Sequence, residues 1–249
     1  MVEPLLQARG LQKRYGGLVA TRDLDLDLYQ GEIHAVIGPN GAGKTTALAQ
    51  LSGEQVPDAG RIVFDGRDVT ALSMPHRARL GIARSYQVTA VFLDFSVLEN
   101  IAVAVQARAR HHFHFFASAG HDDTLRKPAE ALMREVGLEG LAHRPAADLA
   151  HGQRRQLELA MALATEPRVL LLDEPMAGMG AAEADAMGAL LERLRSRYAV
   201  LLVEHDMDMV FRLADRVTVL VDGAVIASGD PAAIRADAAV QAAYLEEST

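Results

Sequence analysis

The sequence contains no cysteine, and its 249 residues include no long hydrophobic run. Without cysteine, a disulfide framework and thiolate chemistry are excluded, a composition that suits the cytoplasm. The longest apolar runs, such as "AVLLV" and "VLLL", are far shorter than the roughly 20 residues needed to cross a bilayer. The opening "MVEPLLQARG" includes Glu3 and no long apolar core, so we expect neither a membrane span nor a signal peptide.

Excess positive charge is also absent. The formal net charge is -8 at pH 7, and lysine occurs only as Lys13, Lys44 and Lys127. General nucleic-acid binders usually carry a basic face, so we expect no nucleic-acid partner. Half of the residues are apolar, which is enough to bury a sizeable core in one domain spanning residues 1–249.

Two kinds of strand pattern are present. Residues 24–28, "LDLDL", alternate apolar and polar side chains, as in a half-buried strand of an antiparallel layer. Residues 32–38, 169–173 and 199–205 are nearly continuous apolar runs, which are typical of strands covered on both faces in a parallel sheet. "RIVFDG", "RVTVLVDG" and "AVIASG" end in glycine turns and predict further strands. The fold class is therefore α/β with an added antiparallel layer.

Helical patterns dominate one internal block. Between residues 96 and 165 the strand signals disappear, which predicts a helical subdomain inserted into an α/β part formed by residues 1–95 and 166–249. Near the end of the chain, Asp230 is a predicted N-cap and Pro231 occupies a first helical position. We expect a terminal helix there.

The segment "GPNGAGKTT", residues 38–46, fits the P-loop pattern G-x-x-x-x-G-K-[ST] between an apolar strand and a helix. Its glycines let backbone amides approach phosphates closely, Lys44 reaches the β- and γ-phosphates, and the Thr45 hydroxyl suits Mg²⁺. An ordinary glycine-rich turn would not require the full spacing. The predicted nucleotide contacts are Gly38, Pro39, Asn40, Gly41, Ala42, Gly43, Lys44, Thr45 and Thr46. Kinases, GTPases and motor ATPases all share this motif.

Two adjacent acids follow the run "VLLL". Asp173 and Glu174 are predicted at the carboxyl end of a core strand, where α/β sheets place their ligands. Asp173 suits Mg²⁺, directly or through water, and Glu174 can polarise an attacking water. Two acids at a solvated strand end would explain the pair alone, but not its occurrence with a P-loop. A kinase has no use for the second acid, so the pair favours hydrolysis.

A second anion site is predicted in "LAHGQ", residues 149–153. Gly152 opens a helix, so bare backbone N–H groups and the positive helix end can face a phosphate. This segment lies more than a hundred residues after the P-loop, and one chain can hardly fold both around one γ-phosphate. Two chains that close each other's nucleotide are the economical solution.

Taken in order, "GPNGAGKTT", "LAHGQ", "LLLDEP" and "VEHD" resemble the Walker A, signature, Walker B and switch-histidine motifs of ABC-transporter ATPases. The resemblance implies an ABC ATPase fold, ATP and Mg²⁺ as ligands, and ATP hydrolysis at a dimer interface. It also implies membrane permease subunits as partners and a peripheral position on the cytoplasmic face of the inner (plasma) membrane.

The resemblance assigns roles to further residues. It implies that Tyr15 stacks on adenine, that Gln87 contacts the γ-phosphate and Mg²⁺ as the Q-loop residue, and that His205 contacts the γ-phosphate. Gly152 and Gln153 carry the signature. Both assignments have a structural alternative. Tyr15 could be an ordinary surface or core ring, and His205 could be a hydrogen-bonded histidine at a strand end.

Within that family, "KRYGGLVA", "VLENIAVA", "DEPMAGM" and "LVEHDMDMVF" resemble ATP-binding subunits of branched-chain amino-acid importers, which also depend on a periplasmic or extracellular solute-binding protein. Importers of urea, short amides or aromatic acids and a regulatory, non-transport ABC ATPase remain alternatives, as does a P-loop kinase. The segment "HHFHFFASAGH", residues 111–121, lacks the i, i+4 histidine spacing of a helical zinc pair, so we favour a partner-facing insertion or core packing over a metal site.

Three positions depart from the usual ABC pattern. Ala150 replaces the signature serine, His151 replaces the first signature glycine, and Gly180 stands where the D-loop usually ends in aspartate. By resemblance, each lies where one chain touches the nucleotide of the other. We therefore expect this chain to pair best with a different ATPase subunit, although a homodimer is an alternative.

The dimer prediction is testable by sedimentation of the Glu174→Gln protein with saturating Mg-ATP. A lost hydrogen bond to a charged phosphate is worth about 1.5–3 kcal/mol, so the chain should dimerise poorly alone and better after Ala150→Ser and Gly180→Asp. A tight homodimer that the added groups do not tighten would contradict the expectation.

Overall fold

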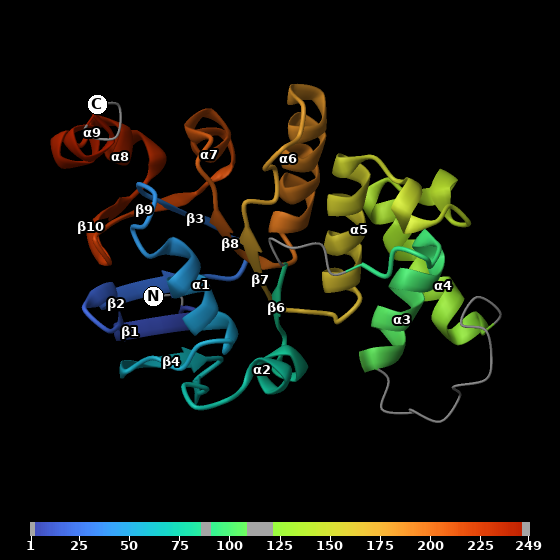
Figure 1. Cartoon of the computed structure of the whole chain (residues 1–249), viewed down its shortest axis with the longest axis horizontal. Helices are drawn as coiled ribbons and strands as arrows, with labels where there is room; N and C mark the ends of the chain where they lie inside the picture. The colour runs from blue at the N-terminus through green and yellow to red at the C-terminus, as the bar shows by residue number, and fades with distance from the viewer. Residues whose placement is uncertain (1–2, 86–90, 109–121, 246–249) are drawn as a thin grey trace.

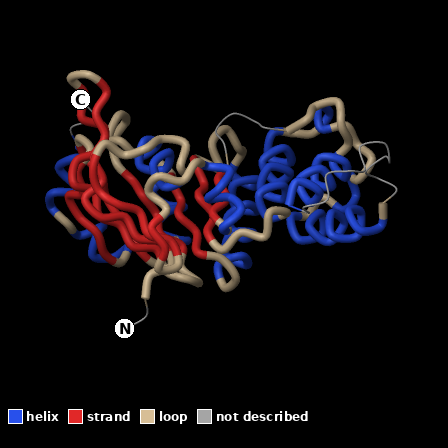
Figure 2. The backbone as a smooth tube through the Cα atoms, turned by 90° about the horizontal axis from the view of Figure 1, so that it is seen from below, coloured by secondary structure: helices blue, strands red, loops and turns tan. Residues whose placement is uncertain are grey.

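The computed structural model describes residues 3–85, 91–108 and 122–245. Strands fill one end of the molecule and a group of helices fills the other (Figures 1 and 2). Gln87 and the segment 111–121 lie outside the described residues, so the expectations for them stay predictions. Among the residues that the structure describes, no helix is both long and apolar enough to cross a membrane.

The antiparallel layer is a four-stranded sheet with the order β2, β1, β4, β5. These strands are β1 (Leu6–Tyr15), β2 (Leu18–Leu28), β4 (Ala59–Phe64) and β5 (Arg67–Asp68). In β2, Leu24, Leu26 and Leu28 are buried, while Asp25 is exposed and Asp27 is partly exposed. The alternation predicted for residues 24–28 is therefore confirmed.

The core sheet has six strands in the order β10, β9, β3, β8, β7, β6. They are β3 (Ile33–Ile37), β6 (Ile82–Arg84), β7 (Val169–Asp173), β8 (Ala199–Val203), β9 (Arg216–Val221) and β10 (Ala224–Gly229). Every residue of β3, β7 and β8 is buried, because helices and the antiparallel layer cover both faces. The strands from β9 to β6 run parallel, and β10 adds an antiparallel edge.

Helices surround the core sheet and form the second end of the molecule (Figure 1). They are α1 (Lys44–Ser52), α2 (Met74–Leu80), α3 (Val97–Arg108), α4 (Asp123–Val136), α5 (His151–Leu163), α6 (Ala181–Arg195), α7 (Met207–Leu213), α8 (Pro231–Ala236) and α9 (Ala238–Leu245), with short 3-10 turns η2 (Glu139–Leu141) and η3 (Ala146–Asp148). Helices α3, α4 and α5 pack together. The subdomain boundaries at residues 96 and 165 stay a prediction.

The chain ends in two helices rather than the one expected. Asp230 caps α8 through the N–H groups of Ala232 and Ala233, at 3.0 and 2.9 Å, as predicted. Asp237 then interrupts the helix with an extended backbone and caps α9 through Ala239 and Val240. Aspartate competes for backbone N–H groups in this way, which explains the break.

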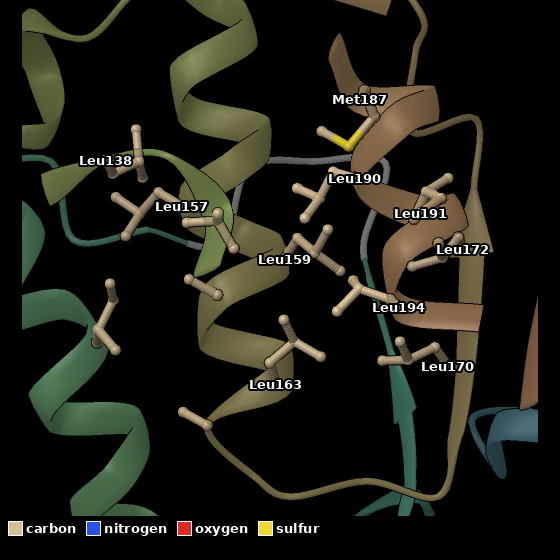
Figure 3. Close-up of a cluster of buried hydrophobic side chains, with 14 of the residues drawn as sticks. Leu138, Leu157, Leu159, Leu163, Leu170, Leu172, Met187, Leu190, Leu191 and Leu194 are labelled. Carbon is tan, nitrogen blue, oxygen red and sulfur yellow. The ribbon is translucent and has the colours of Figure 1, made fainter. Parts of the chain in front are cut away.

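The helix α5 is anchored to the sheet through α6. Figure 3 shows Leu159 and Leu163 of α5 facing Leu190 and Leu194 of α6, with Leu172 of β7 at the right of the view beside α6, and all five are buried. Full burial of a leucine side chain contributes roughly 1.5–3 kcal/mol. This contact holds α5, which begins with the predicted signature residues, against the helix that follows β7 and Glu174.

A buried arginine closes the C-terminal end of α1. Arg77 of α2 donates to the carbonyl oxygens of Gln50 and Leu51 at 2.7 and 2.8 Å, and to those of Thr70 and Leu72. Its side chain is fully buried, and burial lowers the pKa of Arg77 to about 10, against the raising effect of Asp68. The last carbonyls of α1, which lack partners inside the helix, are therefore satisfied by a cation.

The two sheets are joined by a buried histidine. His34 of β3 lies 2.9 Å through Nδ1 from the carbonyl oxygen of Asp27 in β2, and 2.8 Å through Nε2 from the Thr218 hydroxyl in β9. Because a carbonyl oxygen only accepts, Nδ1 carries the proton and Nε2 accepts from Thr218. Burial lowers the pKa of His34 to about 4; the bond to Asp27 opposes this effect, and the charge of Arg216 adds to it.

The lowered pKa of His34 makes the stability of the fold depend on pH. The unfolded chain takes up the His34 proton near the ordinary pKa of 6.5 and the folded chain only near 4. We expect the free energy of unfolding to fall as pH falls through this window, by up to about 3 kcal/mol from this group. Urea unfolding of His34→Gln should show a smaller pH slope than the parent. The exposed His76→Gln control should keep the parental slope, and equal slopes in all three would contradict the assignment.

Candidate nucleotide site

Three neighbouring strands end in one row at the carboxyl edge of the core sheet. Val36 of β3 and Asp173 of β7 are both paired with Val203 of β8. The P-loop therefore begins beside the point where Glu174 and Glu204 leave their strands. This register brings segments far apart in sequence to a single site.

The P-loop glycines are required by the packing of the loop. A Cβ on Gly43 would lie 2.0 Å from the carbonyl oxygen of Ala20, and one on Gly38 would lie 2.0 Å from that of Leu220. Their φ angles are 100° and 149°, a region that side chains disfavour. The loop is thus pressed against β2 and β9, and α1 begins within the P-loop segment at Lys44.

Lys44 is buried and lies inside the loop. Its Nζ donates to the carbonyl oxygens of Gly38 and Pro39 at 2.6 and 2.8 Å. Thr45 is exposed in the first turn of α1, and Thr46 is partly exposed. The ammonium charge and the positive end of α1 therefore face the same loop, as a phosphate site requires.

Asp173 is the last residue of β7 and is almost fully buried. Its Oδ2 accepts from Arg84 Nη2 at 3.0 Å, while its Oδ1 is buried and has no hydrogen-bond partner within the described part of the chain. Burial raises the pKa of Asp173, against the lowering effects of Arg84 and Lys44. A buried carboxylate oxygen left available beside a P-loop fits a hard cation.

The Mg²⁺ expected from the sequence fits these residues. Within the described residues, no group of three or more histidine and carboxylate side chains could hold a metal. Mg²⁺ usually needs no such cage, because it is held by one or two carboxylates together with substrate phosphates. The Asp173 carboxylate and the Thr45 hydroxyl suit that mode.

Glu174 and His205 lie beside Asp173. The Glu174 N–H donates to the carbonyl oxygen of Val203 at 2.9 Å, and its backbone is left-handed, with φ 47°. Its carboxylate is partly exposed, and Oε1 lies 3.9 Å from Nδ1 of His205. His205 follows the end of β8, and 65% of its side chain is accessible. Both side chains are therefore open to solvent at the carboxyl edge of the sheet, where the P-loop begins.

The signature segment packs on its own chain. His151 Nε2 lies 2.9 Å from the carbonyl oxygen of Ala177, and the Gln153 side chain accepts from the Ala150 N–H at 3.1 Å. Gly152 is buried, and a Cβ there would lie 2.8 Å from Glu183 Oε1. In Figure 1, α5, which begins with the signature residues, is drawn on the other side of β6 and β7 from α1.

Tyr15 is the last residue of β1, and 46% of it is exposed. The Nζ of Lys13 lies 5.8 Å from the centre of its ring and pairs with Asp58 at 2.8 Å. An exposed aromatic face is what base stacking needs, and the Lys13 ammonium lies within cation–π distance of the ring. The adenine role of Tyr15 stays a prediction.

A family model described as ABC transporter matches residues 21–177, which is more than half of the chain. The chain belongs to the ABC transporter family. A second model, described as branched-chain amino acid ATP-binding cassette transporter, matches residues 224–245 of this ABC ATPase. The resemblance drawn from the motifs is confirmed.

Curated relatives extend the match over nearly the whole ABC ATPase. The high-affinity branched-chain amino acid transport ATP-binding protein BraF of Pseudomonas aeruginosa is 38% identical over 257 residues, covering 99% of this chain and 100% of the relative. LivG of Escherichia coli, with the same description, is 37% identical over 255 residues, with 99% and 100% covered. The ribose import protein RbsA 2 of Streptomyces avermitilis is 38% identical over 227 residues, covering 90% of this chain and 44% of the relative.

Solved structures show the same fold. The ADP conformation of MJ1267, an ATP-binding cassette of an ABC transporter, matches with a TM-score of 0.88 and 25% identity, covering 98% of this chain and 99% of that one. A nucleotide-free ATP-binding cassette matches with a TM-score of 0.86 and 24% identity, covering 97% and 98%. The α/β P-loop fold with an antiparallel layer is confirmed for this ABC ATPase, which belongs to a class of ATP-hydrolysing transporter subunits.

Two polar residues of this edge were not assigned a role from the sequence. Arg84, at the end of β6, pairs with Asp173 and also with Glu54. Glu204 is buried beside His205. Arg84 could have been found by recognising "IAR" as a short edge strand parallel to β7, since its last residue then falls near the buried acid.

The packing of the P-loop gives a test of its geometry. We expect Gly43→Ala to lower the affinity for ATP at least tenfold, since relieving the clash with Ala20 displaces the loop and overpacking typically costs about 1–3 kcal/mol. Gly66→Ala is the matched control, because its φ is 75° and no atom lies within 4 Å of the added Cβ. It should cost about 1 kcal/mol of stability and leave binding intact. Titration with a fluorescent ATP analogue measures the affinity, and parental binding by Gly43→Ala would refute the expectation.

Proposed function

We propose that this chain is the ATP-hydrolysing subunit of an ABC importer and powers uptake of branched-chain amino acids through a separate transmembrane permease. The observation that carries the hydrolytic role is the row of strand ends that sets Asp173, Glu174 and His205 beside the P-loop. The solute is supported by the C-terminal match at residues 224–245 and by BraF and LivG. Overall identity alone does not decide the solute, because a ribose import protein reaches 38%.

The P-loop residues 38–46 hold the triphosphate in this proposal. Lys44 turns from the loop carbonyls toward the β- and γ-phosphates, and the α1 amides donate to phosphate oxygens. Thr45 and Asp173 would hold Mg²⁺, with Gln87 as a further ligand predicted from the sequence, and the ion would supply positive charge to the phosphates. Arg84 keeps the Asp173 carboxylate oriented.

Glu174 polarises the attacking water in the proposed mechanism. Its partly exposed carboxylate accepts the water proton as the water oxygen attacks the γ-phosphorus, while the bond from that phosphorus to the β–γ bridging oxygen breaks and ADP leaves. His205 then donates to the γ-phosphate oxygens from the neighbouring strand end. Tyr15 stacks on adenine, where base stacking contributes about 1–3 kcal/mol.

The partner chain completes the site in this proposal. Gly152 and Gln153 face the nucleotide of the opposite subunit, and the departures at Ala150, His151 and Gly180 favour a different ATPase subunit as that partner. ATPase subunits of importers act with transmembrane permeases, so we place the chain peripherally on the cytoplasmic face of the plasma membrane. A solute-binding protein delivers the solute to the permease from the other side.

The hydrolytic role is tested with the purified Glu174→Gln protein. The purified variant should bind ATP as the parent does and lose about 10²–10⁴-fold in turnover, because the amide cannot accept the water proton. Parental turnover would contradict the role of Glu174.

The solute is tested in a strain of the source organism that carries the same allele. Uptake of labelled leucine should fall, while uptake of urea and of an aromatic acid stays at the parental rate. Loss of urea or aromatic-acid uptake instead would support the alternative importers. If all uptake persisted although the purified variant was inactive, a regulatory ABC ATPase would be the better interpretation.

A further inference from the structure

Glu204 is a buried carboxylic acid that the mechanism above leaves without a role. It follows the last residue of β8 and directly precedes His205, and 1% of its side chain is accessible. Burial raises the pKa of Glu204, against the lowering effects of two backbone hydrogen bonds and of His205. A carboxyl group is costly to bury, so its contacts are informative.

The two carboxylate oxygens hold two different segments. Oε1 accepts from the Met176 N–H, in the turn after β7, at 3.0 Å. Oε2 accepts from the N–H of His205, in the segment after β8, at 3.2 Å. The side chain therefore fastens the turn that carries Glu174 to the segment that carries His205.

The two hydrogen bonds of Glu204 lie next to a strained backbone position. Glu174 lies two residues before Met176 and has a left-handed φ of 47°. Such conformations are unfavourable and persist only where the surroundings enforce them. The bond from Glu174 N–H to Val203 enforces it on one side, and the bond from Met176 to Glu204 enforces it on the other.

The same carboxylate also lies close to the imidazole. His205 Nδ1 is 3.9 Å from Oε2 of Glu204 and 3.9 Å from Oε1 of Glu174. One ring nitrogen is thus near one buried and one partly exposed carboxylate, which follow different strands. A change in the position of Glu204 alters both the backbone of His205 and its distance from Glu174.

We propose that Glu204 is a positioning residue for ATP hydrolysis, which fixes the Glu174 turn relative to His205 through its two acceptor oxygens. This inference rests on the proposed function of Glu174 and His205. Both oxygens are needed because each accepts from a different backbone N–H. Glutamine offers only one acceptor, and its NH₂ group would face the N–H of one segment.

The alternative is a purely structural role, and Glu32 supplies a matched control. Glu32 is also a buried acid, and it accepts from the Tyr29 N–H at 3.0 Å and from Arg216 Nε at 2.8 Å. It directly precedes β3, at the edge of the sheet opposite the P-loop. Glu32→Gln should therefore lower the free energy of unfolding without changing kcat per folded molecule.

The experiment compares Glu204→Gln, Glu32→Gln and Glu174→Gln with the parent in kcat, KM for ATP and urea unfolding. We expect Glu204→Gln to lower kcat about tenfold to a hundredfold, as small misplacements of reacting groups do, with KM within about twofold of the parent. If Glu204→Gln does not fold, Glu204→Asp takes its place, because it keeps both acceptor oxygens and should retain part of kcat.

The outcomes separate the two proposals. A parental kcat in the folded Glu204 variant, with Glu174→Gln inactive, would overturn the positioning role alone. A loss of activity that matched the loss of folded protein, as in Glu32→Gln, would also overturn it. Parental turnover in Glu174→Gln would instead remove the proposed function on which the inference rests.

Discussion

The parallel register of β3, β8 and β7 is the constraint on which the site depends. Because Val36 and Asp173 both pair with Val203, the three strands stop at one edge, and whatever follows each strand meets its neighbours there. Every residue of these strands is buried, so a one-residue shift in register would exchange the side chains of the two faces and disrupt the packing on both. The register that keeps these strands buried is therefore the same register that brings the P-loop and Glu174 to one edge of the sheet.

The site combines groups that are individually unfavourable in a folded protein. Burial raises the pKa of Asp173 and of Glu204, and Glu174 has a left-handed backbone. The ion pair with Arg84 offsets part of the cost of burying Asp173, and hydrogen bonds from backbone N–H groups offset part of the cost of burying Glu204. Preorganised charge of this kind stabilises a reaction's charged states without further rearrangement, at the expense of stability.

The sequence alone was sufficient to predict the elements that depend on local pattern. Apolar runs located β3, β7 and β8, and glycine spacing located the P-loop ahead of Lys44. The roles of Arg84 and Glu204 could not be predicted, because they depend on contacts between distant parts of the chain. Arg84 donates to Asp173, which is 89 positions away, and Glu204 accepts from Met176, which is 28 positions away. The antiparallel edge β10 and the break at Asp237 likewise depend on contacts or capping that periodicity does not encode.

The buried Arg77 has a mechanical consequence. Its guanidinium binds carbonyls of α1 and of the chain leading into α2 at the same time, so neither helix can shift without breaking several charged hydrogen bonds in a dry environment. The two helices are therefore held together as one unit, with the P-loop at the start of α1. Since α2 also packs on β6, this unit connects the P-loop with the edge strand that carries Arg84.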